Sequence, residues 1–323
     1  MRWTSLRLVL PAVVIAVIWV ANTSLLAGRF AAHPTLLAHR GVHQDYSHDG
    51  VNDDTCTATR ILPPHNDYIE DTLPAIAEAF REGADVVDFD VHPTSDGKWA
   101  VFHDWTLDCR TNGHGVTRDQ TLAYLQSLDV GYGYTADGGS TYPLRGKGIG
   151  LMPSLEDVFT RFPDRRFILH IKSNDPKEGA ALGRTLLRMP REESQRIAVT
   201  GGDRPIEALR RTLPAIKTMS PKSIKACFVR YIALGETGYV PASCRNTVIF
   251  VPVNIAPWLW GWPDRFLSRM HAAGTMVYAV DAYKAGGTKG LNNSADLEKL
   301  PKGYSGGIWT DQIDVVGPAG FTR

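Results

Sequence analysis

The amino-acid sequence predicts a single (β/α)₈ barrel, and three observations favour that fold class. Apolar segments with strand character alternate with helical segments from residue 31 onward, as in a parallel sheet. Eight such strands remain when one hairpin strand is set aside, which is the number that a closed barrel needs. Polar residues suited to catalysis stand where several of these strands end. A doubly wound open sheet is the alternative, but its glycine-rich phosphate motif does not follow the first strand.

The individual elements follow from local patterning. Short apolar runs predict strands at 35–38, 86–91, 166–171, 197–200, 216–219, 247–253, 275–280 and 307–310. Apolar residues at helical spacing predict helices at 72–82, 117–127, 154–162, 178–189, 205–212, 221–234, 264–273 and 295–300. Residues 99–102 read as the hairpin partner of the second strand, and the polar segments 42–69 and 131–150 read as loops.

The first 30 residues differ from the rest of the chain. Arg2 and Arg7 precede an apolar run from Leu8 to Ala27, which is long enough to span a bilayer at about 20 residues. Positive charge ahead of such a run favours export of the remainder of the chain. We therefore expect a signal peptide or transmembrane anchor at 1–30. The barrel at 31–323 is then anchored to the inner membrane facing the periplasm, or is periplasmic or secreted. A buried core helix is the alternative.

Composition limits the partners and the redox state. The formal net charge is +1 and no basic run is interleaved with aromatic residues, so we expect no nucleic-acid partner. The four cysteines lack metal-ligand spacing, and an even number in an exported chain permits two disulfides. Of the three pairings we favour Cys56 with Cys109 and Cys227 with Cys244, because each joins loop-like segments. Four buried free thiols are the alternative.

The candidate chemistry is concentrated between residues 85 and 110. Asp88, Asp90 and His92 alternate along a predicted strand and so share one face. Two carboxylates buried side by side repel each other, and a divalent cation removes that cost. The next strand-like run ends at His103, so the stretch has the layout of a metal-assisted hydrolase. A surface edge strand with solvated carboxylates is the alternative.

A series of motifs extends this pattern along the chain: LLAHRG at 36–41, EDTL through GHG at 70–115, MPSLEDVF at 152–159, ILHIK at 168–172 and GGIWTD at 306–311. In this order and spacing they resemble the glycerophosphodiester phosphodiesterases. The resemblance implies a TIM barrel with an insertion after the second strand, here about 93–150. It also implies metal-dependent hydrolysis of glycerophosphodiesters to glycerol 3-phosphate and an alcohol.

The same resemblance implies roles for single residues, which we expect to converge at the carboxyl ends of the strands. His39 and His103 look like the general acid–base pair, and Arg40 and Lys172 look like phosphate-binding residues. The implied metal ligands are Asp88, Asp90 and His170, with Glu70 as a further ligand or a residue behind the ligands. The remaining histidines His43, His48, His65, His92 and His114 are expected to be loop or surface residues, with His92 as the one that shares the strand face of Asp88 and Asp90.

Three departures from the family pattern affect the metal site. Asp88 stands where the family usually has glutamate, His170 replaces a second glutamate, and Asp71 replaces an asparagine. Imidazole in the ligand set disfavours calcium, so we expect magnesium, manganese or another transition metal.

The expected substrate is a small glycerophosphodiester, and the expected further partner is a membrane through the N-terminal segment. Two other functions stay open. One is lysophospholipase D-type activity on acyl-bearing diesters. The other is a catalytically weak protein that binds a phosphodiester or a lipid headgroup, since a third carboxylate ligand is missing.

Overall fold

The structure is a computed structural model that describes residues 3–48, 50–51, 55–284 and 287–317. Parallel strands run around a curved sheet in the order β6-β5-β4-β2-β1-β9-β8-β7. They are β1 (Thr35–His39), β2 (Val86–Pro93), β4 (Arg166–Ile171), β5 (Ile197–Gly201), β6 (Lys217–Met219), β7 (Val248–Pro252), β8 (Met276–Val280) and β9 (Gly307–Thr310). The sheet's two ends meet at a single parallel bridge between Thr218 and Thr247. The predicted eight-stranded parallel barrel is confirmed, although it is nearly closed rather than fully closed.

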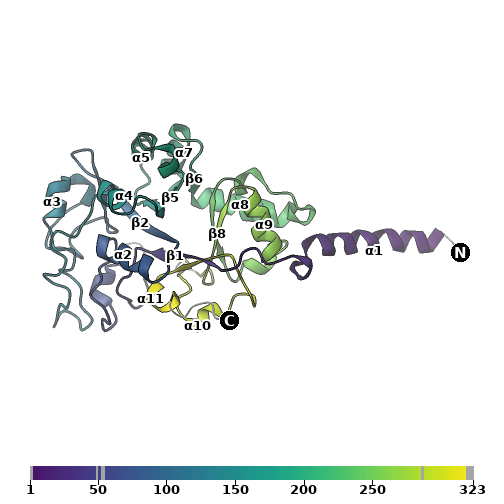
Figure 1. The fold of residues 1–323 in the computed structure, drawn as a ribbon, viewed down its shortest axis with the longest axis horizontal. Coiled ribbons are helices and arrows are strands. Elements are labelled where there is room, and N and C mark those ends of the chain that lie inside the picture. The colour runs from purple at the N-terminus through teal and green to yellow at the C-terminus, as the bar shows by residue number, and fades with distance from the viewer. Residues whose placement is uncertain (1–2, 49, 52–54, 285–286, 318–323) are drawn as a thin grey trace.

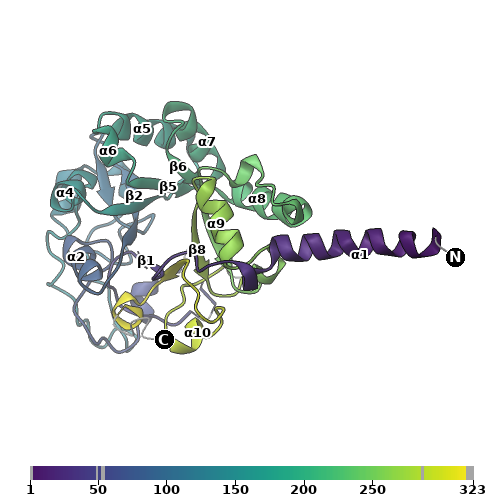
Figure 2. The ribbon, with the colours of Figure 1, turned by 45° about the vertical axis from the view of Figure 1, so that its right-hand side comes forward.

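Helices surround the outer face of this sheet, as two views of the ribbon show (Figures 1 and 2). They are α2 (Leu73–Arg81), α4 (Leu155–Arg161), α5 (Pro176–Leu187), α6 (Arg191–Ser194), α7 (Asp203–Thr212), α8 (Pro221–Leu234), α9 (Asp264–Ala272), α10 (Ser294–Leu297) and α11 (Ile313–Val316). Side-chain caps begin several of them: Thr72 caps α2, and Ser154 forms a reciprocal capping box with Asp157 at α4.

Alternation along the strands separates the core from the site. Inward-facing residues near the amino ends of the strands pack together inside the barrel, among them Leu37, Val86, Ile168, Ala198, Val248 and Tyr278. Further along β1, β2 and β4 the inward positions are polar: His39 pairs in register with Asp88, and Asp90 pairs with His170. Outward residues such as Val87 pack against the helices. An apolar layer therefore supports a polar layer at the carboxyl ends of the strands.

The described residues of the segments predicted as loops at 42–69 and 131–150 contain no named strand or α-helix, as predicted, but both segments contribute side chains to a second small core. Strand β3 (Trp99–Val101) pairs antiparallel with the end of β2, as predicted. Around it pack Ala58, Ile61 and Ile69 of the first segment, Tyr134 and Leu144 of the second, and Leu107, Leu125, Leu128 and Val130, which lie between β3 and the second segment. A disulfide between Cys56 and Cys109 ties the first segment to the insertion, with the Cα atoms 5.7 Å apart. Because these segments are largely polar and their apolar residues are widely separated, this core could not be recognised from the sequence.

Two further findings concern local structure, one a difference from the prediction and one a confirmation of it. The helix predicted at 117–127 is wrong as one element, because Gln120 is extended and Thr121 caps a separate short helix. That stretch holds η3 (Thr117–Asp119) and α3 (Leu122–Gln126). The second favoured disulfide, Cys227–Cys244, joins α8 to η5 (Ala242–Cys244), with the Cα atoms 4.9 Å apart.

The N-terminal helix α1 (Trp3–Asn22) projects away from the barrel in both views (Figures 1 and 2). Its end is held by Arg269, whose Nη1 donates to Asn22 Oδ1 at 2.9 Å. Ile15 and Trp19 are 67% and 57% exposed, which contradicts the alternative of a buried core helix. Within the described residues, no helix combines the length and the hydrophobicity needed to cross a membrane. Arg2 and the side chain of Arg7, on which the anchor prediction partly rests, lie outside those residues.

Candidate active site

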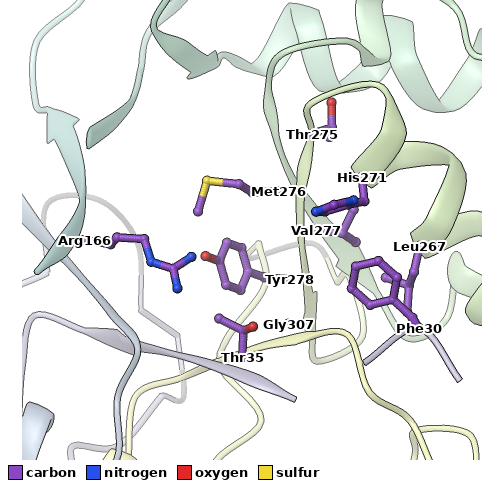
Figure 3. Close-up of a pocket in the computed structure, with 10 residues that line it drawn as sticks. All are labelled: Phe30, Thr35, Arg166, Leu267, His271, Thr275, Met276, Val277, Tyr278 and Gly307. Atoms are coloured by element: carbon purple, nitrogen blue, oxygen red, sulfur yellow. The ribbon is translucent and has the colours of Figure 1, made fainter. Parts of the chain in front are cut away.

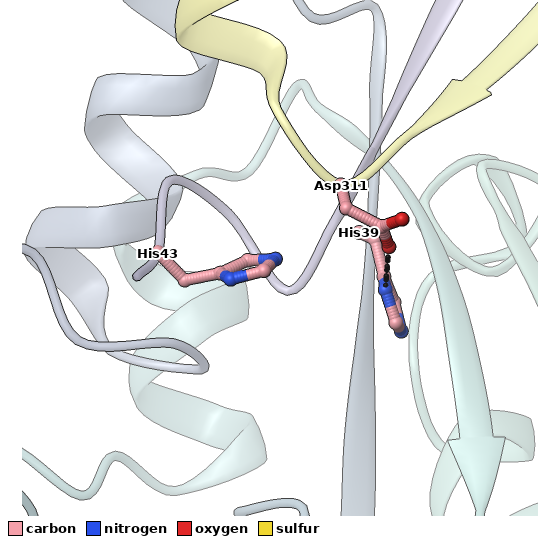
Figure 4. Close-up of side chains that lie close together, drawn as sticks. All are labelled: His39, His43 and Asp311. Atoms are coloured by element: carbon pink, nitrogen blue, oxygen red, sulfur yellow. Dashed lines mark hydrogen bonds and ion pairs between the residues drawn. The ribbon is translucent and has the colours of Figure 1, made fainter. Parts of the chain in front are cut away.

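Two histidines are each held by a carboxylate through the same ring nitrogen. His39 Nδ1 lies 2.6 Å from Asp311 Oδ1, which comes from the residue after β9 (Figure 4). His103 Nδ1 lies 2.6 Å from Oδ1 of its neighbour Asp104, just after β3. A carboxylate on Nδ1 fixes the tautomer and the ring plane and leaves Nε2 as the reacting atom. The two imidazoles are therefore prepared for proton transfer in the same way.

Each of these carboxylates is fixed in turn by other groups. The second oxygen of Asp311 accepts hydrogen bonds from Gly290 N at 2.9 Å and Asn292 Nδ2 at 3.0 Å. Burial alone would raise the pKa of Asp311, but the bond with His39, the electrostatic effect of His39 and His43, and the bond with Asn292 together hold the pKa well below its usual range. Asp104 accepts from Arg110 Nε at 2.9 Å and is likewise held ionised. Both carboxylates therefore keep the negative charge that orients a histidine.

Arg40 connects the first histidine with the acidic side chains. Its backbone is in the left-handed region, with φ +57°, and its N–H donates to the Asp88 carboxylate at 3.1 Å. The guanidinium donates from Nη1 to Glu70 Oε1 at 2.9 Å and forms an ion pair from Nε to Asp90 Oδ2 at 3.1 Å. Burial alone would lower the pKa of Arg40, but the carboxylates of Glu70 and Asp90 together raise it above its usual value. The guanidinium is thus a permanent cation in the polar layer.

The acid pair on β2 has different partners at its two positions. Asp90 Oδ1 faces His170 Nδ1 at 3.0 Å and Lys172 Nζ at 3.5 Å. Lys172 and Arg40 overcome the effect of burial and hold the pKa of Asp90 well below its usual range. Asp88 instead accepts from the Trp309 indole at 3.0 Å, and burial raises its pKa. One carboxylate of the pair is therefore surrounded by cationic groups, while the other is held by neutral donors.

Glu70 is buried, and its carboxylate is bonded to arginines rather than left free for a ligand. Its two oxygens accept from Arg40 Nη1 and Arg110 Nη1, both at 2.9 Å. The two guanidiniums overcome burial and lower the pKa of Glu70 to about 2. Glu70 is therefore engaged by two arginines, and it links the phosphate-binding candidate Arg40 to the side of the site that carries His103.

Asp71 is the residue that best indicates a cation near the acid pair. It is 2% exposed, and neither of its carboxylate oxygens has a hydrogen-bond partner in the described part of the chain. Asp90, Glu70 and Asp88 lie close enough to raise its pKa further after burial has raised it. A divalent cation relieves this arrangement of like charges. The acid pair with Asp71 beside it therefore fits a cation by charge.

Within the described residues, the one group of three or more His, Cys, Asp or Glu side chains close enough together to share a metal ion surrounds His39. It does not include the predicted ligands Asp88, Asp90 and His170. One ligand atom from each of His39, His43 and Asp311 lies within 4.8 Å of the others (Figure 4). His43 Nε2 is buried and has no hydrogen-bond partner among the described residues, while its Nδ1 bonds to Gln44 O at 2.9 Å. Asp311 already bonds to His39 in this structure, so we assign the group to orienting that histidine.

The structure corrects two expectations and adds residues that sequence reasoning missed. His43 and His92 were expected in loops or at the surface, but they are 3% and 1% exposed, and His43 packs edge-on against His39. Sequence reasoning also missed Arg110 and Trp309, whose partners are far away in the sequence. A signal for Arg110 existed in its position next to Cys109, although nothing in the sequence names its partners.

The predicted site residues lie away from the cavity at the other end of the barrel. That cavity measures about 130 Å³ and is lined by the first residues of strands, including Thr35, Arg166, Met276 and Gly307 (Figure 3). It contains none of the residues predicted for catalysis. The predicted barrel-strand residues of the site thus lie at the opposite end, at the carboxyl ends of the strands, where barrel enzymes have their active sites.

Comparison with known proteins decides the family. Residues 39–199 match the model of the glycerophosphoryl diester phosphodiesterase family. The chain belongs to that family. A glycerophosphodiester phosphodiesterase of Bacillus subtilis is 36% identical over 114 residues, which are 34% of this chain and 38% of that protein. A probable glycerophosphodiester phosphodiesterase of Mycobacterium tuberculosis is 36% identical over 101 residues, 31% of this chain and 29% of its own length. The aligned segment thus covers well under half of these relatives.

Solved structures of the family share the fold. A glycerophosphoryl diester phosphodiesterase domain from Mycobacterium tuberculosis superposes with a TM-score of 0.61 at 17% identity, covering 89% of this chain and 99% of that one. An Oleispira antarctica phosphodiesterase, solved in complex with the product sn-glycerol-3-phosphate, has a TM-score of 0.53 at 17% identity and covers 89% and 97%. At this identity the comparison supports the barrel fold.

Proposed function

We propose that this protein hydrolyses glycerophosphodiesters to glycerol 3-phosphate and an alcohol. The observation that carries the proposal is the pair of histidines, His39 and His103, each fixed through Nδ1 by a carboxylate beside the guanidinium of Arg40. Membership in the family and the product complex of the Oleispira antarctica relative support the same substrate class. A phosphodiester needs a cation for its oxygens and two proton-transfer groups, and this set provides both.

The two histidines take complementary roles in the proposed reaction. Burial, and next the charge of Arg40, lower the pKa of His103 to about 3, so its free Nε2 is unprotonated at neutral pH. His103 then accepts the proton of the attacking oxygen nucleophile. His39, facing the ionised Asp311, donates a proton to the oxygen of the leaving alcohol. Arg40 and Lys172 hold the phosphate oxygens as negative charge develops on them.

A divalent cation belongs to this proposal, with Asp88 and Asp90 as its carboxylate ligands and His170 as the nitrogen ligand. Asp71 and Glu70 add negative charge near the acid pair. When bound, the cation neutralises charge on the phosphate and polarises its oxygens. Because His170 replaces a carboxylate, we favour magnesium, manganese or another transition metal over calcium.

The test is hydrolysis of glycerophosphocholine by the purified protein, with release of glycerol 3-phosphate as the readout. We expect activity that is lost on chelation and restored by a divalent metal. His39→Ala and His103→Ala should each abolish turnover while circular dichroism and the unfolding midpoint stay close to wild type. Turnover near the wild-type rate in either variant would contradict the assignment of the acid–base pair.

One observation favours a second candidate, a protein that binds the diester and turns it over weakly. His170 contacts Asp90 at a position where the family usually has a carboxylate. In that case isothermal titration would detect diester binding, while glycerol 3-phosphate release would stay at background with every metal. Comparing a water-soluble diester with a lysophospholipid in the same assay would decide between the soluble and the acyl-bearing substrate.

A further inference from the structure

A buried guanidinium connects the two halves of the candidate site. Arg110 is 1% exposed and donates hydrogen bonds from all three of its nitrogen atoms. Nε donates to Asp104 Oδ2 and Nη1 donates to Glu70 Oε2, each at 2.9 Å. Nη1 also donates to Tyr134 OH, and Nη2 donates to Thr57 Oγ1, each at 2.6 Å. We propose that Arg110 is a positioning residue that orients His103 through Asp104 and Arg40 through Glu70; this rests on the function proposed above.

The geometry of the guanidinium explains why one residue can serve both sides. Its N–H groups lie in one plane and point in fixed directions, so two carboxylates bonded to it are held at a fixed separation. Asp104 bonds to His103, and Glu70 bonds to Arg40. A proton-transfer group and a phosphate-binding group are thereby held relative to each other through these ion pairs. A lysine, with one compact ammonium, cannot occupy these separated positions at once.

The charges around Arg110 support the same conclusion. Glu70 is buried and Asp104 is largely shielded from solvent, so each would be costly to ionise without a cation. Arg110 is the largest influence that lowers the pKa of each of them. The charged groups with the largest effects on the pKa of His103 are Arg40, Asp90 and Lys172, and all three lie on or just after barrel strands. Arg110 is therefore the cation that keeps Asp104 in its acceptor form.

The disulfide fixes the position of Arg110 itself. Cys109 immediately precedes Arg110, and Cys56 immediately precedes Thr57, which accepts from Nη2. The covalent bond thus brings together the two segments that hold this hydrogen bond. The segment 42–69 and the insertion both contribute to the second small core. Through Arg110 they therefore influence the orientation of His103 and Arg40, two residues of the proposed mechanism.

The test uses Arg110→Lys, which keeps the charge, and Arg110→Met, which removes it. We expect kcat to fall about 10–100-fold in Arg110→Lys and further in Arg110→Met, and we expect KM to rise. Thr57→Val is the matched control, because the same guanidinium loses one bond while both carboxylates keep theirs. It should lower kcat far less than Arg110→Lys does, because the bonds to Asp104 and Glu70 remain.

Double-mutant cycles separate positioning from general loss of structure. The loss of kcat in Arg110→Lys should be much smaller in an Asp104→Asn background, and the rise in KM much smaller in a Glu70→Gln background. Additive losses in both cycles, in variants with unchanged unfolding midpoints, would overturn the proposal. Equal losses in Thr57→Val and Arg110→Lys would also overturn it.

A spectroscopic readout keeps the proposal testable if the wild-type protein does not turn over the diester. The Nδ1 proton that His103 shares with Asp104 should give a resolved downfield NMR signal in histidine-labelled protein. That signal should be lost or broadened in Arg110→Lys, while the corresponding signal of His39, which bonds to Asp311, should persist as an internal control. If the His103 signal is unchanged, the positioning role is refuted whatever the activity. Absence of turnover with the expected signals would refute the proposed function alone.

Discussion

Replacing Asp71 by asparagine should stabilise this protein at neutral pH. The Asp71 side chain is 2% exposed, and neither of its carboxylate oxygens has a hydrogen-bond partner within the described residues. The nearby carboxylates of Asp90, Glu70 and Asp88 raise its pKa, whereas the guanidinium of Arg40 lowers it. Its backbone is left-handed, with φ +61°, a conformation that asparagine also adopts. The substitution therefore removes a charge without disturbing the chain.

The sign of the effect depends on pH in a defined way. Burial and the neighbouring carboxylates raise the pKa of Asp71 well above its usual value. Between about pH 4, where the unfolded chain titrates, and the raised pKa, the folded state binds more protons than the unfolded state. Stability contributed by this group is thus present below about pH 4 and is lost as the pH rises through the folded pKa. Above its unfolded pKa, a carboxyl with a raised folded pKa costs about 1.4 kcal/mol of stability for each pH unit up to the folded pKa, so we expect Asp71→Asn to gain on the order of 1–3 kcal/mol at neutral pH and little at the acid end of this range.

Urea unfolding from about pH 4 to about pH 8, in the presence of a chelator, measures this difference. Asp137→Asn is the control of opposite sign, because Thr141 and Thr135 donate to that exposed carboxylate and lower its pKa to about 2. We expect Asp137→Asn to lose stability at neutral pH. If Asp71→Asn is neutral or destabilising at neutral pH, or if its gain does not shrink as the pH falls, the inference of an unpaired buried carboxylate is wrong.

Three other changes test separate parts of the structure. Re-adding metals one at a time after chelation should restore most activity with magnesium or a transition metal, and His170→Glu should shift the preference toward calcium; best activity with calcium in both proteins would contradict the assignment of His170 as a ligand. Serine at both cysteines of Cys56–Cys109 should lower kcat and stability, the latter by about 2–4 kcal/mol, whereas serine at Cys227–Cys244 should lower stability alone. Gly133→Ala should lower the free energy of unfolding in urea by about 1–3 kcal/mol, because the added Cβ would collide with the backbone oxygen of Cys109. Gly28→Ala is the control and should be neutral, because its Cβ would meet no atom.

The barrel could be predicted because each of its elements depends on local pattern. Val86, Asp88 and Asp90 alternate on the inner face of one strand, and the same alternation places His170 on the next strand. A two-residue period is visible in any short stretch of sequence, so the inward side chains could be named before the fold was known. The strand ends could then be assigned to the site by the rule that barrel sites gather at one edge.

The polar contacts of the site could not be predicted, since they join residues that are distant in sequence. Arg110 bonds to Thr57 and Glu70, which lie 53 and 40 positions away. The left-handed backbones of Arg40 and Asp71 are equally invisible, because neither residue type favours that conformation as glycine does. His43 was misplaced for a related reason: its loop looks polar, yet the ring is buried against the site.

The second small core supports the part of the candidate site that the barrel strands do not provide. The barrel strands supply His39, Asp88, Asp90 and His170 from adjacent inward positions. The other acid–base candidate, His103, follows the hairpin strand β3, which is not one of the barrel's parallel strands. A short antiparallel strand cannot hold a catalytic ring by itself, so its orientation must come from the groups that pack on it. The disulfide-linked segments and the guanidinium of Arg110 supply that support, which is why a polar insertion of this length carries a core of its own.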